Sequence, residues 1–100
     1  MIRWTRSARI APGKFLQAVQ FAKEISDYAK KFQGAPPVSV YLDSFGEIGT
    51  IRWFADYEDV AAWEKVANQL YADLEFINRV NQAADLFIPG SVHDSIMRSI

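Results

Sequence analysis

The spacing of apolar residues changes repeatedly along this chain, and the order of these changes restricts the fold more than any other feature. Four stretches alternate apolar and polar residues, as half-buried strands do: 2–10, 38–45, 50–55 and, more weakly, 91–99. Residues 15–32 and 60–71 instead space apolar residues by three and four, as amphipathic helices do, and a shorter helix is expected within 74–86. The order β-α-β-β-α-β predicts an α+β, ferredoxin-like fold, in which the helices cover one face of a four-stranded antiparallel sheet.

The ends of these elements are marked by residues that stop or start regular structure. Gly34 follows the first helix, and Gly46 and Gly49 mark a turn that joins the second and third strands into a hairpin. Asp56 is the predicted N-cap of the second helix, because its carboxylate can accept from free helical N–H groups. Asp73 is the predicted N-cap of the shorter helix that follows.

Length and composition limit the classes of protein to consider. One hundred residues, half of them hydrophobic, predict a single domain over residues 1–100. The formal net charge of -1 gives no basic excess for nucleic acid, and no run reaches the ~18 apolar residues of a membrane span. The chain has no cysteine and its N-terminus has no apolar signal core, so we expect a cytoplasmic protein.

The face of the sheet opposite the helices is expected to be unusually aromatic. Alternation turns Val40 and Trp53 toward the helices and turns Tyr41 and Phe54 the other way. Arg6 interrupts the apolar face of the first strand, and we expect it near an end or an edge of the sheet. A second copy of the chain is the simplest cover for the aromatic face, which predicts a homodimer with a cleft between its two sheets.

Four segments resemble the NIPSNAP-like proteins of the dimeric α+β barrel superfamily. They are RIAPGKF, GEIGTIRWFADYEDVAAWEK, LYADLEFINRV and LFIPGSVHDSIMR, which together span most of the chain. The resemblance implies a homodimer whose two sheets face each other to form a barrel. Relatives in the superfamily include haem-degrading and quinol-forming monooxygenases, lactone isomerases and proteins of unknown activity, so the fold alone does not choose a function.

No metal and no cofactor are expected. His93 is the only histidine and could act as a general base or a haem ligand, but an exposed or interface position is the simpler interpretation. One histidine and no cysteine provide too few of the usual protein ligands for a zinc site. In haem-degrading relatives the axial histidine lies near the end of the second helix, where this chain has Asn78, Asn81 and Gln82.

The candidate site residues gather on the face away from the helices. Arg52, with Arg9 or Arg3 across the sheet, could anchor a carboxylate or an enolate. An ion pair of Arg52 with Asp43, Asp94 or another acid at the dimer interface is favoured over that role. Tyr41 and Asp43 point the same way along one strand and could form an acid/base pair. The candidate cleft residues are Arg9, Tyr41, Asp43, Arg52, Phe54 and His93.

Three interpretations of the function, from different classes, follow from these residues. The first is a homodimer of undefined activity that binds a small anionic organic molecule between its sheets. The alternative is a cofactor-independent monooxygenase or isomerase acting on an enolisable substrate. A purely structural assembly module is the third interpretation.

Overall fold

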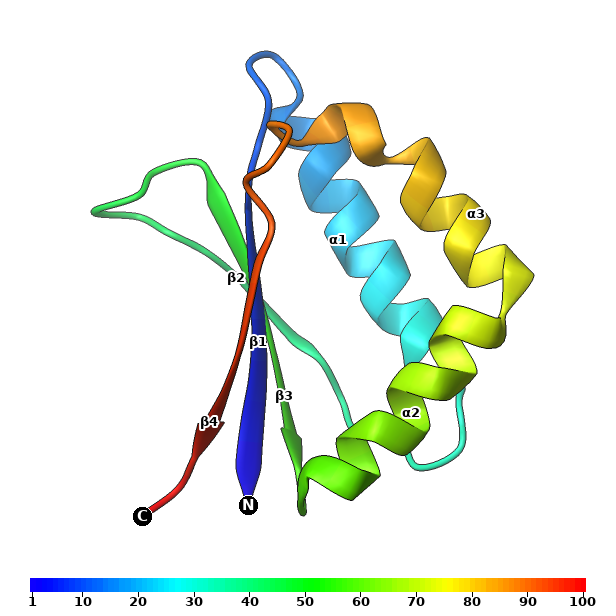
Figure 1. Ribbon diagram of the computed structural model, residues 1–100. Coiled ribbons are helices and arrows are strands. Elements are labelled where there is room, and N and C mark those ends of the chain that lie inside the picture. Colours follow the sequence, from blue (N-terminus) through cyan, green and yellow to red (C-terminus); the bar gives the residue numbers. More distant parts are fainter.

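The computed structural model describes all residues, 1–100, and has its elements in the predicted order (Figure 1). The second helical region is divided into α2 and α3. In chain order the elements are β1 (Ile2–Arg9), α1 (Phe15–Ala29), β2 (Ser39–Leu42), β3 (Thr50–Tyr57), α2 (Val60–Ala72), α3 (Leu74–Gln82), the 3-10 turn η1 (Ala84–Leu86) and β4 (His93–Arg98). The predicted α+β, ferredoxin-like fold is confirmed.

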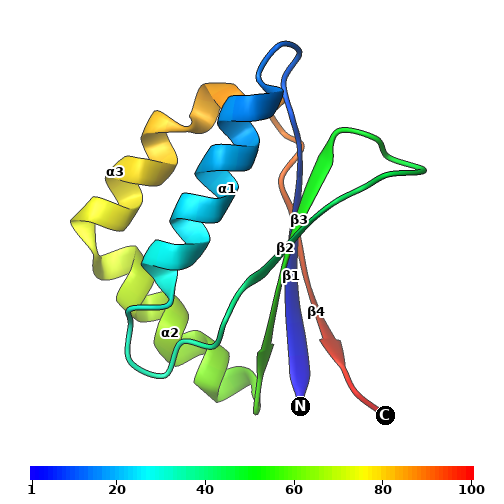
Figure 2. The same cartoon turned by 180° about the vertical axis from the view of Figure 1, so that it is seen from behind.

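The four strands form one antiparallel sheet in the order β2-β3-β1-β4. All three α-helices lie on one side of it, and no element covers the other side, here called the open face (Figures 1 and 2). The hairpin between β2 and β3 projects away from the helices, on the side of the open face. None of the helices combines the length and the apolarity that a membrane crossing requires.

Strand register decides which residues share a face, because residues directly opposite each other in a sheet point the same way. Arg6 lies between Trp53 on β3 and Asp94 on β4, and this row points toward the helices. Ser7 lies between Arg52 and His93, and this row belongs to the open face. The register therefore fixes the faces of β1 and β4, which the sequence pattern leaves open.

Small residues let α1 approach the sheet closely. Ala18 and Ala22 on α1 are completely buried, and they pack with Ala8, Ile51 and Trp53 in one core cluster. Because alanine side chains are short, the axis of α1 can lie close to the sheet at these positions. Larger side chains are needed to fill the space only where the helices and the sheet are further apart. The layers do diverge between the sheet and the pair α2 and α3, and a cavity lies there.

The predicted N-cap of the second helix is wrong. β3 continues to Tyr57, which is buried and pairs with Ile2, so the chain is still a strand at Asp56. Asp59 caps α2 instead, and its Oδ1 accepts from the N–H of Ala62 at 2.8 Å. The carboxylate of Asp56 accepts two hydrogen bonds from Arg3 on the neighbouring strand, at 2.8 and 3.0 Å.

The prediction that Asp73 caps the shorter helix is confirmed. Its Oδ2 accepts from the N–H of Phe76 at 2.9 Å and from the hydroxyl of Tyr28 on α1 at 2.6 Å. The bond from Tyr28 and then the bond from Phe76 lower the pKa of Asp73. One carboxylate therefore starts α3 and also ties the corner between α2 and α3 to α1.

Candidate functional site

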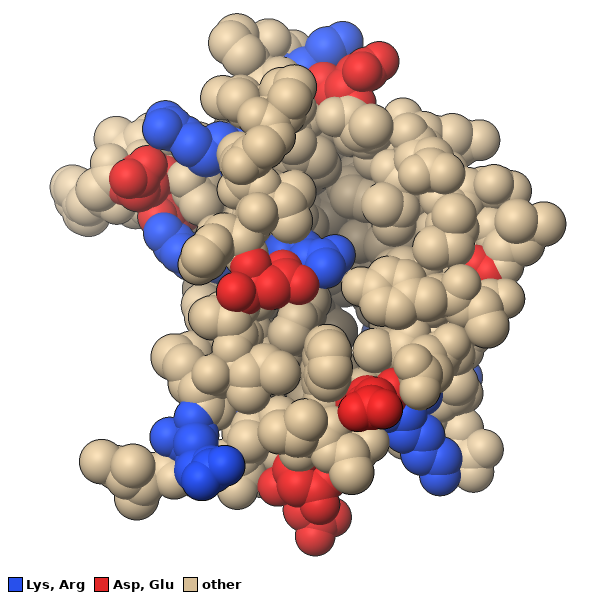
Figure 3. All heavy atoms as spheres, in the orientation of Figure 1, with Lys and Arg blue, Asp and Glu red and all other residues tan.

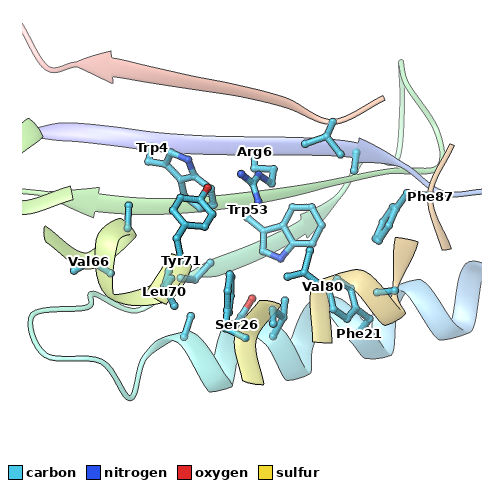
Figure 4. Close-up of a pocket in the computed structure, with 18 of the residues that line it drawn as sticks. Trp4, Arg6, Phe21, Ser26, Trp53, Val66, Leu70, Tyr71, Val80 and Phe87 are labelled. Carbon is cyan, nitrogen blue, oxygen red and sulfur yellow. The ribbon is translucent and has the colours of Figure 1, made fainter. Parts of the chain in front are cut away.

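A cavity of about 370 Å³ lies between the sheet and the helices (Figure 4). Of its 27 lining residues, 21 are hydrophobic, so the site favours an apolar molecule. All three tryptophans of the chain, Trp4, Trp53 and Trp63, contribute to the lining. In the space-filling view the surface is hollowed between β4 and the helices, and most of the atoms around the hollow are neither acidic nor basic (Figure 3).

Arg6 is the one charged residue in this lining. Its Nε and Nη2 donate to the two carboxylate oxygens of Asp94 at 2.7 and 2.8 Å, and its guanidinium lies 5.5 Å from the ring centre of Trp4. Figure 4 shows this guanidinium between Trp4 and Trp53, on the side of β1 that faces the cavity. The side chain of Arg6 is 31% exposed, so the charge borders both the cavity and water.

The surroundings of Arg6 keep it charged. The hydrogen bond to Asp94 raises its pKa most, burial opposes this rise, and the phenol of Tyr71 adds a smaller rise. Tyr71 is 61% exposed, and its hydroxyl lies near Arg6 and Trp4 in Figure 4. Deeper in the cavity the polar groups are few: the hydroxyl of Ser26 donates to the carbonyl of Ala22 at 2.7 Å. The Nε1–H of Trp53 is buried without a hydrogen-bond partner, and Tyr57 and Asn81 also line the cavity. Arg6 is the one charged donor among the groups that could recognise a polar atom of a ligand.

The residues predicted from the sequence lie on the open face, away from this cavity. Arg52 donates through Nε and Nη2 to both carboxylate oxygens of Asp43 at 2.8 and 2.9 Å, which is the ion pair favoured above. The bond from Arg52 lowers the pKa of Asp43, so this carboxylate stays ionised and is a poor partner for proton exchange with Tyr41. The ring of Tyr41 instead meets the edge of Phe54, with ring centres 5.5 Å apart.

The outer members of the predicted set are further apart. Arg9 lies 3.4 Å from Glu47 in the hairpin, as a half-exposed ion pair. His93 lies at the start of β4, opposite Ser7, and its side chain is exposed. The structure thus brings together Tyr41, Asp43 and Arg52 with Phe54, and it leaves Arg9 and His93 at the margins of the same face.

Comparison with known proteins gives a match at the level of structure. No family model matches the chain, and no curated protein does. A NIPSNAP family protein of unknown function from Agrobacterium tumefaciens superposes with a TM-score of 0.81 at 17% identity, over 99% of this chain and 87% of that one. An uncharacterised NIPSNAP domain protein from Burkholderia xenovorans gives 0.83 at 14% identity, over 100% and 95%. The chain shares the fold of these NIPSNAP proteins.

The NIPSNAP fold is shared with an enzyme. A solved antibiotic biosynthesis monooxygenase superposes with a TM-score of 0.76 at 13% identity, over 100% of this chain and 99% of that one. At these identities the likeness shows the fold and leaves the chemistry to the residues of this chain.

The sequence pattern predicted neither the place of Arg6 in the cavity wall nor its pairing with Asp94. Arg6 was expected near an end or an edge, but it lies in the middle of β1, bonded to strands on both sides. A signal was present, since an arginine between Trp4 and Ala8 on the apolar face of a strand needs an acidic partner. The partner, Asp94, is 88 residues away, and only the register identifies it.

Proposed function

We propose that this chain forms a homodimer through the open face of its sheet and binds a small organic molecule in the cavity on the other face. The dimer is supported by apolar side chains that no element of the same chain covers. Tyr41 is 60% exposed and Met97 is 48% exposed on the open face. The projecting hairpin carries Phe45, which is 90% exposed. Burial of such side chains favours association at about 25 cal/mol per Å².

The charges of the open face also fit a second copy better than a free ligand. Arg3, Arg9 and Arg52 are each paired with an acid of their own chain, Arg3 with Asp56, Arg9 with Glu47 and Arg52 with Asp43. A paired arginine can be covered by another protein surface without leaving an uncompensated charge. An anionic ligand held between the sheets, as the sequence suggests, stays a prediction, and so does a cytoplasmic location.

The single observation that carries ligand binding is the apolar cavity with Arg6 in its wall. A cavity lined by apolar side chains from both layers can bury most of a small ligand's surface, and one charged donor in its wall can orient that ligand. The same features support no particular reaction.

An enzymatic function is the second candidate, and the likeness to an antibiotic biosynthesis monooxygenase favours it. A guanidinium beside an apolar cavity could stabilise an enolate, because its N–H groups donate strongly to a developing negative oxygen. Roles for Tyr41, Asp43, Arg52 and His93 in moving a proton stay predictions. Oxygen uptake or substrate isomerisation by the purified protein would favour the enzyme over a binding protein.

Ligand binding can be tested with the neutral dye N-phenyl-1-naphthylamine, whose emission rises in apolar surroundings. Ala67 on α2 lines the cavity, and Ala61 on the same helix is exposed and does not. Ala67→Phe should reduce the dye signal by filling the cavity, while Ala61→Phe should leave it unchanged. The proposed site is wrong if the dye does not bind, or if the two variants behave alike. Native mass spectrometry of the purified protein tests in parallel for a bound compound.

A further inference from the structure

The ion pair between Arg6 and Asp94 decides what charge a ligand can carry. Arg6 is the one charged group in the cavity lining, and Asp94 already compensates that charge with two short hydrogen bonds. The pair as a whole is therefore close to neutral. A ligand carboxylate placed against it would be a second negative group beside a single guanidinium.

Arg6 nevertheless keeps donors free for a ligand. A guanidinium carries five N–H bonds, and Asp94 occupies only the edge formed by Nε and Nη2. The second N–H of Nη2 and both N–H bonds of Nη1 remain. If the hydroxyl of Tyr71, which lies on this side, takes one of them, two are still available. The site thus offers strong donors without a net positive charge.

From this arrangement we propose that the cavity ligand is uncharged where it meets Arg6, and that it bears a neutral oxygen acceptor such as a carbonyl on an aromatic or alicyclic body. Asp94 is then the residue that excludes carboxylates. The inference rests on the proposed function and names the substrate class of the same cavity.

Two physical effects separate the two kinds of ligand. A carbonyl loses little on leaving water and gains hydrogen bonds from a charged donor, which are stronger than those between neutral groups. A carboxylate loses far more hydration, and Asp94 repels it at short range. Discrimination of this kind depends on a repulsive element, here the carboxylate of Asp94.

The open face supplies a matched control for the pair. Arg3 and Asp56 make the same two bonds, Nε to Oδ1 and Nη2 to Oδ2, at 2.8 and 3.0 Å. This second pair lies on the opposite side of the sheet and does not line the cavity. Substitutions there change the same chemistry at a distance from the proposed ligand.

The test uses three probes that share one aromatic body: 2-acetylnaphthalene, 2-naphthoate and 2-ethylnaphthalene. Binding is measured by titration calorimetry and by quenching of the tryptophans, all of which line the cavity. For the unaltered protein at pH 7 we expect the ketone to bind about tenfold more tightly than the hydrocarbon, and the carboxylate to bind most weakly. Asp94→Asn should strengthen naphthoate binding by about tenfold, and Asp56→Asn should change the affinity for none of the three probes.

Each other result has a defined meaning. If naphthoate binds the unaltered protein most tightly, or if ketone and hydrocarbon bind equally, the inference is overturned while the cavity remains a binding site. If Asp94→Asn binds the three probes with the same relative affinities as the unaltered protein, Asp94 is not the residue that excludes carboxylates. If no probe binds, the proposed function itself fails. Circular dichroism confirms folding, and Asp94→Ser replaces Asp94→Asn if β4 does not tolerate asparagine.

Discussion

Replacing Tyr41 by alanine tests the proposed dimer at an exposed aromatic residue of the open face. A tyrosine side chain presents about 200 Å² of surface, and at 60% exposure about 120 Å² of Tyr41 is available to a partner. At about 25 cal/mol per Å², full coverage is worth about 3 kcal/mol in each copy. A two-fold dimer covers the residue twice, so half coverage still predicts a loss of about 3 kcal/mol, or about a hundredfold in the dissociation constant.

The assay is sedimentation velocity over a series of protein concentrations. Tyr71 provides the control, because it is 61% exposed but lies on the helix side of the sheet. Tyr71→Ala should leave self-association unchanged, whereas Tyr41→Ala should shift the transition from dimer to monomer to higher concentration. Because Tyr41 also contacts Phe54, thermal melting of each variant separates weaker association from a less stable fold.

Two results would refute the reasoning. The first is an unaltered protein that stays monomeric up to tens of micromolar, a concentration at which an interface worth about 8 kcal/mol would be well populated. The second is an equal effect of the two substitutions, which would mean that the open face is not the surface of association.

Two further predictions concern the caps. Asp59→Ala should lower the free energy of unfolding by about 1 kcal/mol and the melting temperature by about 4–8 °C, because it removes the cap of α2. Asp56→Ala should have a smaller effect on both quantities. Equal effects of the two substitutions would contradict the assignment of Asp59 as the cap. Asp73→Asn should melt below the unaltered protein at pH 7. Because hydrogen bonds from Tyr28 and Phe76 lower the pKa of Asp73, its contribution is full above the ordinary value of 3.8 and is lost as the pH falls through the lower folded value. The difference in melting temperature should therefore shrink below pH 3.8, and a gap that is constant with pH would argue against an ionised Asp73.

The periodicity of the sequence was enough to predict the order of the elements, because each amphipathic element buries one face. It did not predict where β3 ends. Tyr57 continues the alternation of Trp53 and Ala55, and both Asp56 and Asp59 are suitable caps, so the choice depends on pairing with β1. Such pairing brings together residues far apart in the chain and leaves no local signal.

Prediction of the candidate site was limited for the same reason, because the sequence does not show which distant residues pair. Parity along a single strand correctly grouped Tyr41 with Asp43, and Arg52 with Phe54. It did not reveal that Arg6 and Asp94 share a face, since that requires the register between β1 and β4. The sequence did not predict the cavity either, because the cavity exists where α2 and α3 lie away from the sheet. The periodicity of apolar residues indicates which way a side chain points, but it does not indicate how far apart the two layers are.

The alternation of β1 has a consequence for how a chain of this kind can change. Its odd-numbered residues, such as Arg3 and Ser7, face the proposed partner, and its even-numbered residues, such as Trp4 and Arg6, face the helices and cavity. A substitution at an even-numbered position can therefore change the proposed ligand preference without changing the proposed dimer interface, and a substitution at an odd-numbered position can do the reverse. An insertion or deletion of one residue within β1 would exchange the two sets at once, because it reverses every side chain beyond it. Divergence of this strand is expected to proceed by replacement at constant length, with length variation confined to the loops.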